Sequence, residues 1–326
     1  MQRRIFSNAV VALAVTQIVP STASAQTLAF PTKPITIVIP VPPGGTADFV
    51  MRVVQNKLAE TLGVSVVIES KSGASQQIGT NYVIQAEPDG HTLLFTVDSH
   101  VVNAVANNKL PYDALRDLTP ISMFVRQPFV IGCHPSLPIS NLRELIVYAK
   151  SNPRKLNFGS PGQGTLSFLV LESIKKLANI DVVHIAYKGA APAMQAVLAN
   201  EVQYNAISLG GQLPHIRSGR LKPLAVTSSH RVSALPEVPT VAEMGFPDFE
   251  AQNWMGLFSP AKVPRMIIDK LYTAINSTLS DTEIRNRLIV GGYDVTATNP
   301  EEFNRFIANE FKRWDSFAKA NNIVFE

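Results

Sequence analysis

Short β-rich runs alternate with helical patterns through most of the chain, and this alternation is the feature that most constrains the fold. The first unit is typical: Ile35 to Pro40 reads as a buried strand, a Pro/Gly turn follows, and Thr46 to Leu62 has the pattern of a helix. Strands that alternate with helices usually pair in parallel within α/β layers. We therefore expect an α/β protein with largely parallel sheets.

The alternation changes along the chain. Strands are expected at 35–40, 64–70, 92–97, 156–159, 182–186, 202–207 and 221–227, and helices at 46–62, 78–86, 142–150, 165–178 and 191–198. The last third is mostly helical, at 264–279, 281–290 and 300–319, with a short terminal strand at 323–325.

The length predicts two domains. The chain has 326 residues, 46% of them hydrophobic and 17% charged, which is enough apolar surface for a sizeable core. The segments 121–132 and 235–260 have no low-complexity character, and we interpret them as strands that cross between two lobes. The first lobe is then discontinuous, at 26–124 and 236–326, and the second lobe spans 125–235.

Residues 1–25 have the three parts of an export signal. Arg3 and Arg4 form a basic start, an apolar stretch runs from about Ala9 to Val19, and small residues precede Gln26. The apolar stretch is shorter than the roughly 20 residues that span a bilayer. We predict a signal peptide that is cleaved after about Ala25 and an exported protein, with the choice between Sec and twin-arginine export left open.

Charge and cysteine content exclude several classes of function. Arg3 and Arg4 account for half of the formal net charge of +4, and no run of Lys and Arg follows them, so nucleic-acid binding is not expected. The single cysteine, Cys133, cannot form an intramolecular disulfide and ends an apolar strand, so we interpret it as a buried structural thiol. The six histidines are scattered without a metal-binding spacing, and we predict neither metal nor cofactor.

Two glycine-containing corners join a strand to a helix and could bind an anion. They are Pro42 to Asp48 and Gly159 to Thr165, each with a hydroxyl residue suited to cap the helix. The alternative for each is a plain capped turn, and neither matches the GxxxxGK[ST] loop of nucleotide hydrolases. A third candidate, 71–77, follows the second strand.

The candidate ligand-binding residues lie in these corners and in loops beside them. They are Pro43, Gly44, Gly45, Thr46, Ala47, Asp48, Ser75, Gln76, Ser99, His100, Ser160, Gly164, Thr165 and Ser208.

The sequence offers little for catalysis. No GxSxG elbow precedes a helix, and Asp98-Ser99-His100 is interpreted as the loop after the third strand rather than as a triad, because triad members are assembled by the fold. Trp254 and Trp314 are expected to be packing residues. We predict a binding protein and no enzyme.

Several stretches spread over the chain resemble the substrate-binding proteins of tripartite tricarboxylate transporters, the Bug family. They include PTKPITIVIPVPPGGTAD at 31–48, PDGHTL at 88–93, DLTPI at 117–121, NFGSPG at 157–162, HIAYKG at 184–189 and LPEVPT at 235–240. The resemblance implies a two-lobed periplasmic-binding-protein fold of type II-like form, with two doubly wound sheets joined by crossing hinge strands.

The resemblance also implies a function. Such proteins close over one small solute, mostly a di- or tricarboxylate, an aromatic acid or an amino acid, and deliver it to membrane permease subunits. The loops around Pro43 to Asp48 and Ser160 to Thr165 are expected to hold one carboxylate. We expect a monomer. A ligand sensor for a membrane two-component kinase, and an exported hydrolase or lyase, are the alternatives.

This sequence departs from the family pattern after the second strand. Ser75, Gln76 and Gln77 stand where the family usually has glycines, so specificity does not transfer from any one relative. Asp48 and Asp98 are the only carboxylates in the candidate loops. We therefore expect an organic acid without a required ammonium group.

Overall fold

The computed structural model describes residues 30–106 and 110–323. From Pro31 onward the chain forms one compact unit, to which the description below refers. The predicted signal peptide and the predicted terminal strand beyond Ile323 lie outside the described residues.

The first sheet contains the first three strands in parallel. Strand β1 (Ile35–Ile39) lies between β2 (Val66–Ser70) and β3 (Thr92–Val97). On the far side of β3, β9 (Gln252–Pro260) pairs antiparallel, and β4 (Leu118–Cys133) follows it. The short β10 (Asp294–Val295) pairs with β4.

The second sheet repeats this arrangement with other strands. Strand β5 (Asn157–Ser160) pairs in parallel with β6 (Val183–Ala186) and β7 (Tyr204–Ser208). Strands β7 and β8 (Lys222–Val226) both pair antiparallel with the end of β4. The predicted parallel order is thus correct within β1 to β3 and β5 to β7, while antiparallel strands join the two groups.

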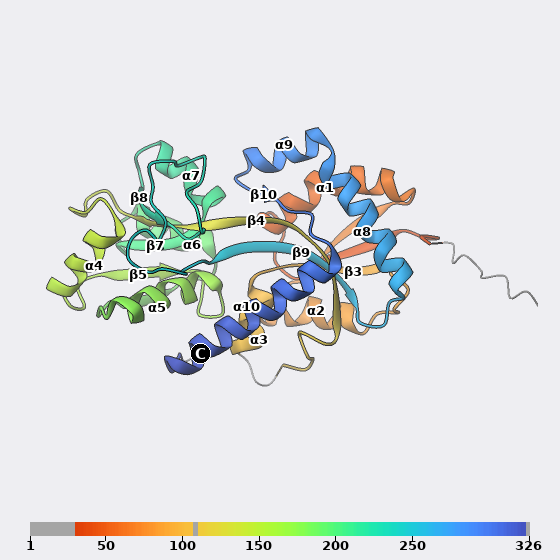
Figure 1. The fold of residues 1–326 in the computed structure, drawn as a ribbon, viewed down its shortest axis with the longest axis horizontal. Helices are drawn as coiled ribbons and strands as arrows, with labels where there is room; N and C mark the ends of the chain where they lie inside the picture. The colour runs from red at the N-terminus through yellow and green to blue at the C-terminus, as the bar shows by residue number, and fades with distance from the viewer. Residues whose placement is uncertain (1–29, 107–109, 324–326) are drawn as a thin grey trace, which may run out of the picture. The chain divides into compact units, whose positions relative to one another are not determined.

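One strand belongs to both sheets. Residues Leu118 to Pro128 of β4 pair with β9 in the first sheet, and Phe129 to Cys133 pair with β7 and β8 in the second. Figure 1 shows β4 and β9 running side by side between the two groups of helices. The predicted class, an α/β fold with two sheets joined by crossing strands, is confirmed. The predicted lobe boundaries at 124 and 235 stay a prediction.

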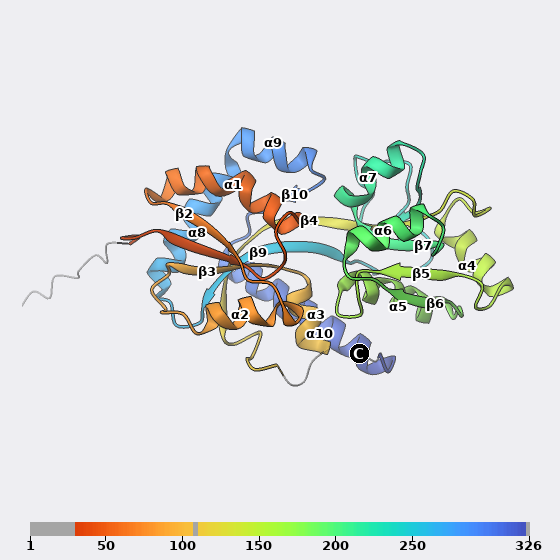
Figure 2. The same ribbon diagram turned by 180° about the vertical axis from the view of Figure 1, so that it is seen from behind.

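Helices cover both sheets. Those beside the first sheet are α1 (Thr46–Leu62), the short turn η1 (Ala74–Gln76), α2 (Gln77–Ile84), α3 (Ser99–Ala106), α8 (Arg265–Ser280), α9 (Thr282–Val290) and α10 (Pro300–Ala320). Those beside the second are α4 (Leu142–Ser151), α5 (Leu166–Ala178), α6 (Ala190–Leu198) and α7 (Leu209–Arg217). Figure 2 shows the same ribbon from behind.

Two helices were not expected from the sequence. The segment after β3 was interpreted as a loop, yet Ser99 and His100 are the first residues of α3. Helix α7 contains Gly210, Gly211 and Pro214, which have low helix propensity. Its short length and the burial of Leu209 and Leu213 indicate that packing, rather than propensity, stabilises it.

The core confirms the predicted packing residues. Trp254 is fully buried and packs edge-on against Phe303 and Phe306, and Trp314 is also buried. Cys133 is fully buried, and burial raises the pKa of its thiol to about 11. Each large side chain of this kind stabilises the fold by about 1.5 to 3 kcal/mol through burial.

The topology brings particular loops together. Strands β1, β2, β3, β5, β6 and β7 each lead into a helix or turn that starts beyond their carboxyl ends. In open α/β sheets, ligands bind at this edge. Within the described part of the chain, no helix has the length and apolar character to span a membrane.

Candidate functional site

A cleft of about 760 Å³ lies where the carboxyl ends of strands from both sheets meet. Its lining comes from the turn after β1, the end of β3, η1, and the turns after β5, β6 and β7. The lining residues are Val41, Pro42, Pro43, Gly44, Gly45, Thr46, Gln76, Val97, Ser99, Pro161, Thr165, Lys188, Gly189, Ala190, Ala191, Pro192, Met194, Gln195, Ile207, Gly211 and His215.

The turn after β1 lines the cleft with residues Val41 to Thr46. Gly44 has φ +82°, which favours glycine, and Gly45 is the N-cap of α1. We expected Thr46 to cap this helix, but Thr46 is its first helical residue. The N-cap is Gly45, which has no side chain that could form a cap bond. Thr46 is exposed and lines the cleft, and it is not the N-cap of α1.

Asp48 holds this turn rather than lining the cleft. Its carboxylate accepts hydrogen bonds from Gly44 N at 3.1 Å and from Arg52 Nε at 2.9 Å. The Arg52 bond lowers the pKa of the Asp48 carboxyl below its ordinary value. Asp48 and Ala47 are both buried behind the turn. Both were predicted to contact the ligand, and neither belongs to the lining.

The loop after β2 has unusual backbone geometry. Ala74, Ser75 and Gln76 all have positive φ values, of 44°, 50° and 75°. Left-handed backbone is rare for residues with a Cβ and tends to occur at functional sites. The loop therefore has a backbone conformation that favours glycine, although all three residues carry a Cβ.

Gln76 links this loop to the end of β3. Its Oε1 accepts from Thr96 Oγ1 at 3.1 Å, and its Nε2 donates to Ser99 Oγ. Gln76 and Ser99, both of them predicted ligand contacts, line the cleft. Ser75 does not line the cleft. Its carbonyl oxygen accepts a hydrogen bond from Asn103 Nδ2 at 2.6 Å.

The turn after β5 is a capped helix start. Thr165 is the N-cap of α5, accepts weakly from Phe168 N at 3.4 Å and donates to Gly162 O at 2.6 Å. This predicted cap is confirmed, and Thr165 lines the cleft. Gly164 lies beside it and faces Asn103, since a Cβ on Gly164 would lie 3.3 Å from Asn103 Oδ1.

Ser160 is buried and stabilises this turn through a hydrogen bond. Its Oγ lies 2.7 Å from His184 Nε2 and accepts from Gly162 N at 3.2 Å. The His184 ring packs between Phe158 and Phe168, and burial lowers its pKa to about 4. Ser160 is fully buried, so it shapes the turn and does not line the cleft.

The other predicted residues have structural positions. His100 is buried, its Nε2 lies 3.1 Å from Ala114 O, and burial lowers the pKa of the ring to about 4. His100 therefore lies away from the cleft lining. Ser208 is the N-cap of α7 and lies between the lining residues Ile207 and Gly211 without lining the cleft itself.

One wall of the cleft contains none of the residues predicted from the sequence. Lys188 to Pro192, Gln195 and His215 belong to the turns and helices after β6 and β7. Gly189, at φ +117°, is the N-cap of α6. The predicted strand 182–186 and helix 191–198 already enclosed this turn, so the rule applied to the other corners would have found it.

The charge and the helix dipoles at the cleft are positive. Among the described residues that line it there is no Asp or Glu, and Lys188 is the only side chain with a permanent charge. The first turns of α1, α5 and α6 add N–H groups without partners in the helix and the positive ends of their dipoles. In the described part of the chain, no group of His, Cys, Asp and Glu is placed to hold a metal ion. The arrangement is suited to an anion.

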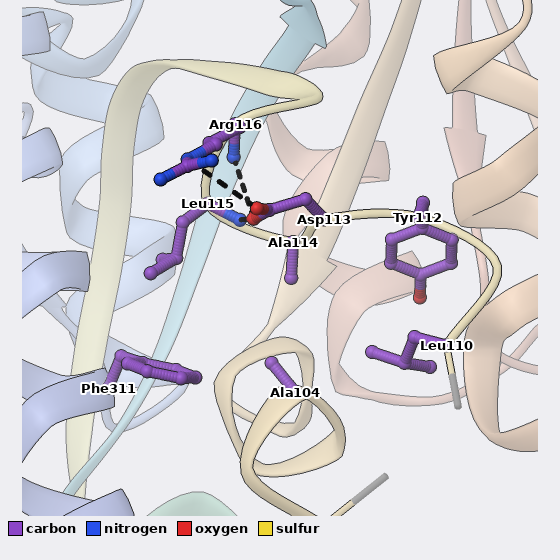
Figure 3. Close-up of a pocket in the computed structure, with 8 residues that line it drawn as sticks. All are labelled: Ala104, Leu110, Tyr112, Asp113, Ala114, Leu115, Arg116 and Phe311. Atoms are coloured by element: carbon purple, nitrogen blue, oxygen red, sulfur yellow. Dashed lines mark hydrogen bonds and ion pairs between the residues drawn. The ribbon is translucent and has the colours of Figure 1, made fainter. Parts of the chain in front are cut away.

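A second hollow of about 430 Å³ lies beside Tyr112 and Phe311 (Figure 3). Asp113 points into the adjoining turn, where Oδ1 accepts from Leu115 N at 2.9 Å and from Arg116 N at 3.2 Å. Arg116 pairs with the same carboxylate at 3.6 Å. These groups bond to one another, and the hollow lies outside the set of helix starts described above, so we assign the ligand site to the cleft.

Comparison with known proteins decides the family. The model of the tripartite tricarboxylate transporter family receptor matches residues 50–323. The chain belongs to this receptor family. A curated relative, the protein BugT of Bordetella pertussis, is 33% identical over 287 residues, covering 87% of this chain and 88% of that protein. The resemblance found in the sequence is confirmed, and the chain is a solute-binding receptor.

Solved structures of receptors agree with the fold. The periplasmic binding protein BugD has a TM-score of 0.80 at 30% identity, covering 91% of this chain and all of BugD. An R. palustris protein solved with adipate has a TM-score of 0.83 at 30% identity, with the same coverage. MatC from Rhodopseudomonas palustris, solved with malate, has a TM-score of 0.78 at 30% identity, covering 88% of this chain and 99% of MatC.

Proposed function

We propose that the chain is a periplasmic receptor that captures a small organic carboxylate in the cleft and delivers it to the permease subunits of a tripartite tricarboxylate-type transporter. The observation that carries this proposal is the meeting of the α1, α5 and α6 helix starts at a cleft whose described lining has no carboxylate. The relatives solved with adipate and malate support the same class of ligand.

The energetics suit reversible capture. A helix start contributes about 0.3 to 2 kcal/mol to binding an anion, and a hydrogen bond to a charged group contributes about 1.5 to 3 kcal/mol. Several such contacts give micromolar affinity, for which about 8 kcal/mol is needed. An ammonium group would find no carboxylate partner in the described lining, so the proposed ligand is an acid without a required amino group.

A role without catalysis is also part of the proposal. The Ser160 and His184 side chains are in hydrogen-bond distance, but Ser160 Oγ belongs to a fully buried residue that does not line the cleft. A substrate in the cleft would not reach this hydroxyl. The pair therefore favours a structural role over an exported hydrolase.

A ligand screen with a matched variant pair tests the proposal. Thermal shifts and calorimetry would compare mono- and dicarboxylates, aromatic acids and amino acids. We expect acids without an amino group to stabilise the protein, and Thr46→Val to weaken their binding by about 1 to 3 kcal/mol while the fold is kept. Thr61→Val is the control, because Thr61 lies at the other end of α1 and donates to Lys57 O. Stabilisation by amino acids alone would contradict the proposal.

A further inference from the structure

The wall of the cleft beside the second sheet holds its ionisable side chains. Within the described lining these are Lys188 and His215. Lys188 directly precedes Gly189, the N-cap of α6, and His215 lies in α7. Both ribbon views show α6 and α7 as neighbours (Figures 1 and 2). The lining residues of the turn after β1, by contrast, Val41 to Thr46, include no ionisable side chain.

Arg220 determines which nitrogen of the neutral His215 ring carries the proton. The Arg220 guanidinium lies 2.7 Å from His215 Nδ1. A guanidinium has no acceptor, so Nδ1 must accept, and the neutral ring carries its proton on Nε2. Burial, together with the charge of Arg220, lowers the pKa of His215 below its ordinary value, which favours the neutral ring.

The backbone holds this pair in place. His215 O accepts from Arg220 N at 3.0 Å, from Leu221 N at 3.1 Å and from Ser218 Oγ at 3.1 Å. Gly219 turns the chain at φ +71°. With Nδ1 occupied by Arg220, Nε2–H is the polar group that the ring has left to offer the cleft. A neutral donor and a lysine ammonium in the lining of one cleft suit a second acidic group, and the lysine charge repels an ammonium.

We propose that Lys188 and His215 bind the second acidic group of the ligand, and that Arg220 is a positioning residue that keeps the His215 donor at Nε2. This proposal rests on the proposed function, since it concerns the same cleft. It states that the protein prefers a dicarboxylate to the monocarboxylate of equal chain length, and that this preference resides in the α6 and α7 wall.

Calorimetry with matched acids tests this assignment. The probes are succinate with butanoate and adipate with hexanoate, measured on the full protein. We expect the wild type to prefer at least one dicarboxylate to its partner by roughly tenfold to a hundredfold. His215→Phe and Lys188→Met should each reduce this preference, while His215→Gln, which retains a neutral donor, should preserve most of it.

The positioning role has its own readout. The ¹⁵N shifts of the imidazole should place the His215 proton on Nε2 in the wild type. Arg220→Met should give a mixture of tautomers and a smaller preference for dicarboxylates. Arg217→Met is the matched control, because it removes an arginine of α7 that is exposed and should change neither reading.

The outcomes separate the two proposals. If the wild type binds none of the screened acids, the proposed function fails, and this inference fails with it. If it binds acids without preferring a dicarboxylate, or if the preference survives His215→Phe and Lys188→Met, the proposed function stands and this inference is overturned. If His215→Phe does not fold, Lys188→Met decides, since Lys188 is exposed and its loss removes no packing.

Discussion

At the scale of single residues, two buried polar side chains stabilise the turns at the cleft and do not line it. Asp48 fixes Gly44 N, and Ser160 fixes Gly162 N. A buried polar group needs a partner to offset its lost hydration, and here the partners are the turns themselves. Residues with the chemistry expected of ligand contacts therefore lie one layer behind the cleft.

Asp98 is the residue with the most unusual acidity. Burial raises the pKa of its carboxyl from 3.8 to about 7, although Asn253 and Ser99 N donate hydrogen bonds to it, and the nearby Glu310 adds repulsion. The folded chain thus holds a proton that the unfolded chain releases between about pH 4 and 7. This group's contribution to stability is present below pH 4 and is lost as the pH rises through that window.

We therefore expect Asp98→Asn to flatten the pH dependence of stability. An asparagine has a similar shape, keeps one acceptor oxygen and cannot ionise, so the variant should lose less stability than the wild type between pH 5 and pH 8. Urea unfolding at several pH values measures this directly. Asp181→Asn, at an exposed position, is the control. Parallel pH curves for the wild type and Asp98→Asn would contradict the assignment.

At the scale of elements, the sequence predicts what depends on local pattern and fails where packing decides. The strand and helix of the first unit were predicted at 35–40 and 46–62, and they occur at Ile35–Ile39 and Thr46–Leu62. Helix α7 was missed because its glycines and proline are weak helix formers and only the fold supplies its buried face. The same holds for α3, where Ser99 and His100 looked like loop residues.

The candidate site, too, was predicted where the local sequence pattern is sufficient and was missed where packing decides. Glycine and hydroxyl residues after a strand identified Gly44, Gly45, Thr46 and Thr165, which line the cleft. Whether a side chain such as Asp48 or Thr46 faces outward depends on which groups bond within the turn, and the pattern does not contain this information. Lys188 was missed although the strand–glycine–helix pattern around Gly189 was visible, whereas His215 lies in α7, which the pattern does not predict.

The turn η1 allows a test of backbone strain. Ser75 has φ 50° and ψ 46°, where a residue with a Cβ is disfavoured. We expect Ser75→Gly to raise the free energy of unfolding by up to about 1 kcal/mol, because the gain in the folded state exceeds the entropy cost of glycine. Ser72→Gly is the control at negative φ and should give no gain. An equal response of both variants in urea unfolding would remove the argument for strain.

At the scale of the whole compact unit, β4 belongs to both sheets, and close contacts at two glycines bring the sheets together on either side. On one side Gly164 faces Asn103 of α3. On the other, a Cβ on Gly210 of α7 would lie only 2.7 Å from Gly291 O, and Gly210 N donates to Gln127 Oε1 of β4 at 3.0 Å. Glycine at these positions permits the close approach that encloses the cleft.

Gly210→Ala should therefore hold the two sheets apart. The added methyl group would force a shift, and overpacking of this kind costs about 1 to 3 kcal/mol. We expect ligand affinity to fall by roughly five- to 150-fold, while the variant remains folded, since alanine favours the α7 helix. Small-angle scattering should show a larger radius of gyration with ligand present than in the wild type. Unchanged affinity and scattering would show that Gly210 does not govern closure.

The proposed function depends most on the binding of a carboxylate by backbone amides at the helix starts. An ¹⁵N transverse-relaxation-optimised titration with adipate tests it directly, because each amide reports separately. We expect saturable chemical-shift changes that are concentrated at the amides of Gly45, Thr46, Gly164, Thr165 and Gly189. Saturable binding whose largest shifts lie instead around Tyr112 to Arg116, with the amides of the helix starts unchanged, would contradict it.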